Sequence, residues 1–82
     1  MYYIYILQSI EKGGYYVGHT ADLSKRIEKH NRGEVKSTKS KKPWRLVYFE
    51  KFETRSVANL RERQIKSYKG GEAFKKLLQL NQ

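Results

Sequence analysis

The sequence contains no cysteine, two histidines and one proline in 82 residues. Without cysteine the chain forms neither disulfides nor thiolate metal sites, and a reducing, cytoplasmic interior suits it. Two histidines make a multi-histidine zinc site unexpected. No apolar run approaches the roughly 20 residues of a membrane span, and the strand-forming residues 2–5 leave no room for a secretory signal pattern. We therefore expect one small domain over residues 1–82, with no membrane partner.

Acidic residues are also scarce. Eight Asp and Glu face 18 Lys and Arg, which gives a net charge of +10. Such a surplus points to a polyanionic partner, most commonly nucleic acid, and does not distinguish DNA from RNA. Six cations gather in one segment, opposed only by Glu34: Arg32, Lys36, Lys39, Lys41, Lys42 and Arg45. We expect these six to bind nucleic-acid phosphates; the alternative is a solvated loop that keeps a small protein soluble.

Strand and helix patterns are both present along the chain. Aromatic and β-branched runs predict strands over 2–7, 15–18 and 44–52, the first two joined as a hairpin. Capping residues and apolar spacing predict helices over 23–31, from a cap at Thr54 or Ser56 to about Lys69, and from Glu72 to about Leu80. The order β-β-α-β-α-α predicts an α/β fold of the α+β kind, a small sandwich of three strands and packed helices.

The first predicted helix carries polar residues where a structural pattern would place apolar ones. Arg26 and His30 share one stripe with Leu23 and Ile27. A core-facing stripe does not normally include an arginine without a partner. The alternative is that both side chains lie at the edge of the stripe and extend to water.

Glu62 borders the apolar side of the second long helix. It could hold a hard divalent cation through oxygen, or it could simply pair with Lys66 one turn later. Arg61 falls on the same apolar side, and the sequence pattern does not explain an arginine there.

In the hairpin, Tyr5 and Tyr16 could bring their rings together on one face, either as core residues or as parts of a site.

In this order, the segments resemble the GIY-YIG endonuclease superfamily, and in particular its small stand-alone bacterial branch. The resemblance runs from about residue 2 to residue 80. It is carried by Tyr3-Ile4-Tyr5, Tyr16-Val17-Gly18, Arg26, His30 and the segment 61–66 with Glu62. It implies a three-stranded antiparallel sheet flanked by helices, and an endonuclease that hydrolyses phosphodiester bonds with one divalent metal, Mg²⁺ or Mn²⁺.

The resemblance also implies roles for five side chains. Tyr5 and Tyr16 match the two motif tyrosines, one of which would orient or deprotonate the attacking water. Arg26 would clamp the scissile phosphate, His30 would relay a proton or position a tyrosine hydroxyl, and Glu62 would hold the metal. The resemblance also suggests DNA repair or processing as the setting, and it makes DNA, rather than RNA, the expected partner.

The sequence departs from the family pattern at two motif positions. Tyr3 stands where the first half-motif has glycine, and Val17 where the second has isoleucine; both residues suit a strand, and the motif tyrosines are unchanged.

Two other hypotheses about function stay open. One is a nucleic-acid-binding module that kept the fold and lost catalysis, and the other is a protein-interaction domain whose charge serves acidic partners or solubility.

Overall fold

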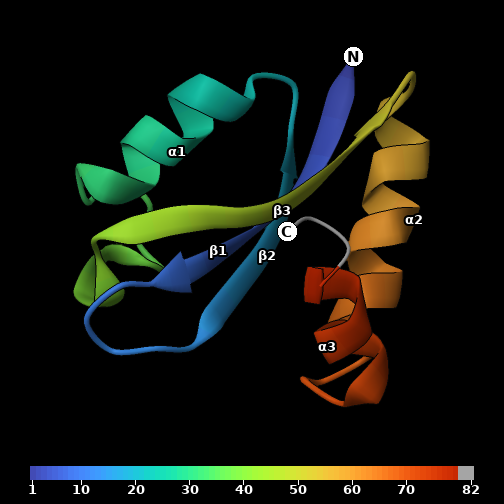
Figure 1. The fold of residues 1–82 in the computed structure, drawn as a ribbon. Coiled ribbons are helices and arrows are strands. Elements are labelled where there is room, and N and C mark those ends of the chain that lie inside the picture. Colours follow the sequence, from blue (N-terminus) through green and yellow to red (C-terminus); the bar gives the residue numbers. More distant parts are fainter. Residues whose placement is uncertain (80–82) are drawn as a thin grey trace.

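The structure, a computed structural model, describes residues 1–79. Its elements, drawn in Figure 1, are β1 (Tyr2–Ser9), β2 (Tyr15–Thr20), α1 (Leu23–Asn31), the 3₁₀ turn η1 (Lys39–Lys41), β3 (Trp44–Phe52), α2 (Arg55–Lys66) and α3 (Glu72–Gln79). The predicted order β-β-α-β-α-α is confirmed, and η1 is the element that the sequence pattern did not predict. Over residues 1–79, no helix combines the length and apolarity that crossing a bilayer requires.

The three strands form one antiparallel sheet in the order β2-β1-β3. β1 is central, and its Tyr5 lies opposite Gly18 of β2 and Phe49 of β3. Helix α1 covers one face of the sheet, whereas α2 and α3 lie on the other (Figure 1). The expectation of a three-stranded antiparallel sheet flanked by helices is therefore confirmed.

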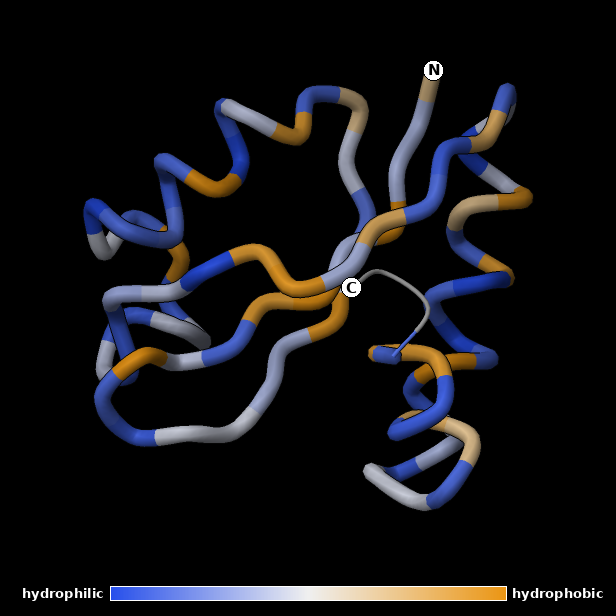
Figure 2. The backbone as a smooth tube through the Cα atoms, in the orientation of Figure 1, coloured by the Kyte–Doolittle hydropathy of each residue, from blue (hydrophilic) through white to orange (hydrophobic). Residues whose placement is uncertain are grey.

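The alternation of β1 divides the core into two clusters. Successive side chains of a strand point to opposite faces, and nearly every residue of β1 is apolar, so both faces can be buried. Ile4 and Ile6 pack with Ala58 and Ile65 under α2 and α3, and Tyr5 and Leu7 pack with Trp44 under α1. Figure 2 shows hydrophobic segments gathered along the crossing strands, with hydrophilic residues on the outer side of α1.

Helix ends follow their capping residues, with one correction. Asp22 caps α1 through a bond from the Lys25 backbone N–H, at 3.1 Å, and Thr54 caps α2. α2 ends at Lys66, however, and the prediction that it runs to about Lys69 was wrong. Lys69 (φ +52°) and the next residue have left-handed backbone, which a right-handed helix cannot accommodate. The predicted end of the last helix, near Leu80, lies outside the described residues.

The basic segment between α1 and β3 is fixed on its inner side. The side-chain amide of Asn31 bonds the backbone N–H and C=O of Trp44, at 2.6 and 3.0 Å. The Trp44 indole N–H donates to the carbonyl of Thr38, which is buried. These contacts hold the segment against the sheet, while the six cations named above are all exposed.

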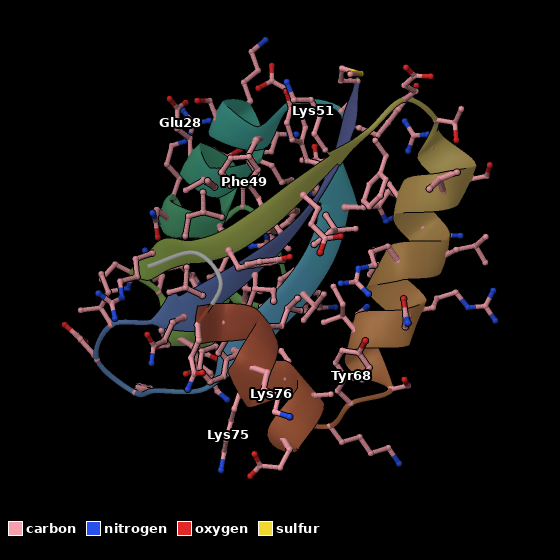
Figure 3. All side chains as sticks on the ribbon, turned by 45° about the vertical axis from the view of Figure 1, so that its right-hand side comes forward. Glu28, Phe49, Lys51, Tyr68, Lys75 and Lys76 are labelled. Atoms are coloured by element: carbon pink, nitrogen blue, oxygen red, sulfur yellow. The ribbon has the colours of Figure 1, made fainter. Side chains whose placement is uncertain are left out.

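The position of Arg61 has a structural reason. Arg61 donates from Nε and Nη2 to the two carboxylate oxygens of Glu50 on β3, each at 2.8 Å, and Glu50 also accepts the Tyr48 hydroxyl. The pair therefore ties α2 to β3. The alternate residues of β3, Phe49 and Lys51, lie on the α1 side instead (Figure 3).

Candidate active site

A small pocket of about 160 Å³ opens at the β2 edge of the sheet. Four elements supply its walls: Tyr5 from β1, Tyr16, Gly18 and His19 from β2, Arg26 from α1 and Glu62 from α2. The structure thus brings four of the five expected site residues to one pocket. The fifth, His30, is fully buried behind it and bonds to the Tyr5 hydroxyl.

The pocket draws on both faces of the sheet. In the β1–β2 ladder Tyr5 lies opposite Gly18, whereas the neighbouring residue of β2, His19, points to the other face. Tyr5 therefore lies on the α1 side with Arg26, and His19 lies on the α2 side with Glu62. Because β2 is an edge strand, groups from both faces meet around it at one opening.

Gly18 leaves the space that the Tyr5 ring occupies. A Cβ at this position would lie 2.7 Å from the Tyr5 hydroxyl oxygen and 3.1 Å from a ring carbon of Tyr16. Both distances are shorter than ordinary carbon contacts. The glycine of the second half-motif is thus required because two tyrosine side chains pass over its Cα.

A chain of hydrogen bonds fixes the protons around Tyr5. The Thr38 hydroxyl donates to the Val35 carbonyl, at 3.3 Å, and accepts from Nδ1 of His30, at 2.7 Å. His30 therefore carries its proton on Nδ1, and its Nε2 accepts from the Tyr5 hydroxyl at 2.9 Å. Nε of Arg26 donates to the same hydroxyl at 3.4 Å.

Burial sets the charge states in this chain. Burial raises the pKa of Tyr5 from 10 to about 12, although the hydrogen bond from Arg26 opposes it. Burial and the positive charge of Arg26 lower the pKa of His30 from 6.5 to about 4. At neutral pH Tyr5 is therefore a phenol, His30 is a neutral imidazole, and Arg26 supplies the positive charge.

Tyr16 completes an aromatic group around His30. Its ring centroid lies 6.3 Å from that of Tyr5, 5.0 Å from that of His30 and 6.4 Å from that of Trp44. The two motif tyrosines thus lie on one face of the hairpin. The ring packing of Tyr16 and its place in the pocket wall coexist, so the structural and functional interpretations of this residue are compatible.

Glu62 is held between two cationic or potentially cationic groups. One carboxylate oxygen bonds Nδ1 of His19, and the other lies 2.6 Å from Nζ of Lys66. Burial alone would raise the pKa of Glu62, but the hydrogen bonds from Lys66 and His19 outweigh it and lower the pKa below its usual value. The carboxylate is therefore charged at neutral pH, and its helical pairing with Lys66 is present together with its place in the pocket.

Glu62 is the residue of this pocket that could hold a divalent ion. Within residues 1–79, no group of three or more His, Asp or Glu side chains gathers in metal-binding geometry. A carboxylate offers about four lone-pair positions, of which His19 and Lys66 use two. Since Mg²⁺ is commonly held by one or two carboxylates plus water and substrate phosphates, the donor set fits an ion bound to Glu62 alone.

The six cations predicted to bind phosphate lie outside this pocket. None of Arg32, Lys36, Lys39, Lys41, Lys42 and Arg45 is among its lining residues. Arg32 pairs with Glu34 at 3.0 Å, and Arg45 donates to Gln8 at 2.9 Å. The same segment carries Thr38, whose hydroxyl is hydrogen-bonded to His30. The basic segment is therefore linked to the buried histidine through Thr38. Binding of nucleic acid by these cations stays a prediction.

Sequence reasoning missed His19 and Thr38. His19 follows the second half-motif directly, and strand alternation places it on the face opposite Tyr5, toward the helix that carries Glu62. That alternation was a usable signal. Thr38 gave none, because its contact with His30 depends on the path of an irregular segment.

The fold and the pocket together define a small nuclease-like domain in which a tyrosine pair, an arginine and a glutamate meet at a sheet edge. The family model of the GIY-YIG catalytic domain matches residues 1–75. The chain belongs to the GIY-YIG family.

Its relatives include small proteins of the same kind. A UPF0213 protein of Haloquadratum walsbyi is 44% identical over 68 residues, which cover 82% of this chain and 75% of that one. A UPF0213 protein of Staphylococcus aureus is also 44% identical over 68 residues, covering 82% of each chain. The solution NMR structure of a UPF0213 protein from Bacillus halodurans aligns with a TM-score of 0.60 and 33% identity, over 98% of this chain and 85% of that one.

Proposed function

We propose that this protein is a metal-dependent endonuclease that hydrolyses phosphodiester bonds in DNA, in repair or processing in the cytoplasm. One observation carries the proposal: Tyr5, Tyr16, Arg26 and Glu62, which come from four separate elements, line one pocket. If these residues served the fold alone, there would be no reason for Arg26 and Glu62 to approach the buried Tyr5 from opposite faces of the sheet. Family membership supports the same chemistry.

Arg26 is suited to grip the scissile phosphate. Its Nε is engaged with the Tyr5 hydroxyl, so its two terminal nitrogens are the ones to donate to phosphate oxygens. A planar guanidinium matches a pair of such oxygens. This contact would place the phosphorus next to Tyr5.

Tyr5 is suited to orient the attacking water. The Tyr5 hydroxyl donates its proton to His30 and accepts a hydrogen bond from Nε of Arg26, which leaves one lone pair on its oxygen. That lone pair can only accept, so a water bound to it must be the donor. As that water attacks phosphorus, its proton passes to the Tyr5 oxygen, the Tyr5 proton passes to Nε2 of His30, and the bond from phosphorus to the leaving oxygen breaks. A bound phosphate offsets the charge of Arg26, which is one of the causes of the low pKa of His30, and so favours the transfer.

Glu62 would hold one Mg²⁺ or Mn²⁺ ion, with His19 and Lys66 keeping the carboxylate ionised and oriented. When bound, the ion supplies neutralisation of charge on the phosphate and at the leaving oxygen. The charged state of Glu62 at neutral pH is the property that such a ligand needs.

The proposal is tested by incubating the pure protein with branched, nicked, single-stranded and double-stranded DNA and with RNA, each with Mg²⁺ or Mn²⁺. We expect cleavage of at least one DNA substrate, and a loss of about 100-fold or more in rate for Glu62→Gln. Glu53→Gln is the matched control, because Glu53 is exposed and outside the pocket. Equal cleavage by Glu62→Gln and wild type would overturn the role of Glu62.

One observation favours a second candidate, a nucleic-acid-binding module without catalysis. Both oxygens of Glu62 already have protein partners, and Tyr5 is held as a phenol. A pocket in this state binds a phosphate through Arg26 without activating water. Salt-sensitive DNA binding, with no cleavage on any substrate of the panel, would establish this alternative in place of the nuclease.

A further inference from the structure

A second, larger pocket adjoins the candidate active site. Its volume is about 310 Å³, at the lower end of the range for small-molecule sites. It lies among β2, the end of α2 and the start of α3. Its lining residues are Tyr15, Tyr16, Val17, Ile65, Lys66, Lys69, Gly70 and Phe74. The proposed hydrolysis assigns this pocket no role.

The walls combine aromatic rings with cations. Phe74 meets Tyr15 edge-on, with the ring centroids 5.1 Å apart and the planes at 70°. Tyr15 is 47% exposed, so a large part of this strand side chain is open to a ligand. Lys66 and Lys69 are both exposed. An exposed tyrosine ring backed by the buried Phe74 and bordered by lysines suits a flat heterocycle that carries a phosphate.

The turn that closes the pocket has a costly backbone conformation. Lys69 has φ +52°, in the left-handed region that side-chain-bearing residues adopt at an energetic cost. Gly70, which follows, lines the pocket with the same sign of φ. Strain of this kind is often retained where a surface serves a ligand. Here both residues of the turn, Lys69 and Gly70, line the pocket.

The two pockets share residues. Tyr16 lines both of them, and Nζ of Lys66, at the larger pocket, lies 2.6 Å from the Glu62 carboxylate at the smaller one. A nucleotide with its phosphate at Arg26 therefore has an aromatic cavity directly beside it. Figure 3 shows Lys75 and Lys76 on the adjoining helix α3, which adds positive charge to this end of the molecule.

We propose that the larger pocket binds one unpaired nucleobase next to the phosphate held in the active pocket, and so selects single-stranded or locally unpaired DNA. The placement beside the cleaved bond rests on the proposed function, whereas base binding itself does not. A paired base is stacked inside the duplex and must leave the stack to enter a pocket. We therefore expect the protein to prefer DNA in which the base is already unpaired and unstacked.

Binding is measured without divalent metal, in EDTA, so that cleavage has no influence on the result. Fluorescence anisotropy compares a labelled single-stranded oligothymidine with a duplex of the same length. We expect Tyr15→Leu, which keeps an apolar side chain but removes the ring, to weaken single-strand binding about 5-fold or more. Duplex binding should change by less than about 2-fold, since phosphate contacts dominate it.

Lys69→Glu and Lys25→Glu form a matched pair, because both replace an exposed lysine by the same charge and Lys25 lies outside both pockets and the basic segment. Lys69→Glu should weaken single-strand binding more than Lys25→Glu, and the two should weaken duplex binding alike. Equal effects of the two variants on the single strand would overturn the proposal and leave a general charge effect. Equal weakening of single strand and duplex by Tyr15→Leu would overturn it as well.

A measurement on the wild-type protein decides the question even where Tyr15→Leu fails to fold. Amide NMR shifts are followed on titration with thymidine monophosphate and with deoxyribose 5-phosphate. Shifts centred on Tyr15, Val17 and Gly70 with the nucleotide, and absent with the sugar phosphate, support a base pocket. The same shifts with both ligands, or none with either, overturn it.

Discussion

The absence of a side chain at Gly18 makes room for the two tyrosines of the candidate site. Gly18 is covered by Tyr5 and Tyr16 at distances that exclude a Cβ. The same position lets Tyr5, a residue buried under α1, present its hydroxyl at the edge of the sheet. The conformational freedom of glycine is not its role here, since its backbone is that of an ordinary strand residue; only its size matters.

His30 makes stability depend on pH. Unfolded, its imidazole takes up a proton near pH 6.5, whereas in the folded protein, with burial and Arg26 opposing the charge, it does so only near pH 4. Between these values the unfolded state binds more protons, so stability falls as pH is lowered from 6.5 to 4, by up to about 3 kcal/mol from this group.

This contribution is measured by urea denaturation of the wild type and His30→Gln at several pH values. The variant should lose the part of the pH dependence that His30 contributes, whereas the contribution of the carboxylates is common to both proteins. The same pH dependence in the two proteins would contradict the assignment of a neutral, buried His30.

The residue scale also shows where sequence reasoning was sufficient. The hairpin pattern allowed the rings of Tyr5 and Tyr16 to meet on one face, and the i, i+4 spacing placed Arg26 next to His30. In the structure the two ring centroids lie 6.3 Å apart, and the Tyr5 hydroxyl hydrogen-bonds both Arg26 and His30. His19 was missed because a lone histidine on a short strand has many ordinary uses. Strand alternation gives the face on which His19 lies, but its pairing with Glu62 also depends on how α2 crosses the sheet, which strand periodicity does not encode.

At the scale of elements, the ion pair between Arg61 of α2 and Glu50 of β3 fixes how the helix lies on the sheet. Both side chains are about one-fifth exposed, so the pair lies between the surface and buried cases. We expect Arg61→Met to destabilise the fold by about 1–2 kcal/mol, because it leaves Glu50 half-buried without its cation.

A double-mutant cycle with Glu50→Gln separates the pair from the individual side chains, with free energies of unfolding from urea denaturation. Arg32→Met is the control, since the Arg32–Glu34 pair is largely exposed and should contribute less than about 0.5 kcal/mol. If the coupling between Glu50 and Arg61 were no larger than that of the control pair, the docking role would be wrong.

The ends of elements were predictable where a local cap defines them. Asp22 and Thr54 cap their helices through their own side chains, and α1 and β3 have the predicted bounds. α2 ends earlier than the apolar pattern indicates. The pattern includes Tyr68, which is partly buried and still packs against the core although it lies in the turn after the helix. Apolar spacing indicates which residues are buried, and residues after the end of the helix can be buried too, so the spacing alone does not locate the last helical residue.

At the scale of the whole molecule, the net charge of +10 predicts salt-dependent binding of nucleic acid. Replacement of Lys39, Lys41 and Lys42 by glutamine should reduce the slope of log K against log salt by about 0.9 for each duplex phosphate that the variant no longer neutralises. The maximal cleavage rate should change little, because none of the three lines the active pocket.

Anisotropy titrations at several salt concentrations measure this slope. Glutamine at Lys25, Lys29 and Lys51, which are also exposed, removes the same charge from the α1 side of the molecule. An identical reduction of the slope in both triple variants would assign the effect to net charge alone and would remove the special role of the basic segment.

The sheet order also limits how further strands can join this molecule. A strand added along β2 would lie across the backbone at Gly18 and seal the opening beside it. Lateral growth of the sheet, by a second copy or by another chain, is thus compatible with an open pocket only along β3. Two copies joined there would share one continuous sheet and place their openings at its opposite margins, each free to engage a different stretch of the same polymer.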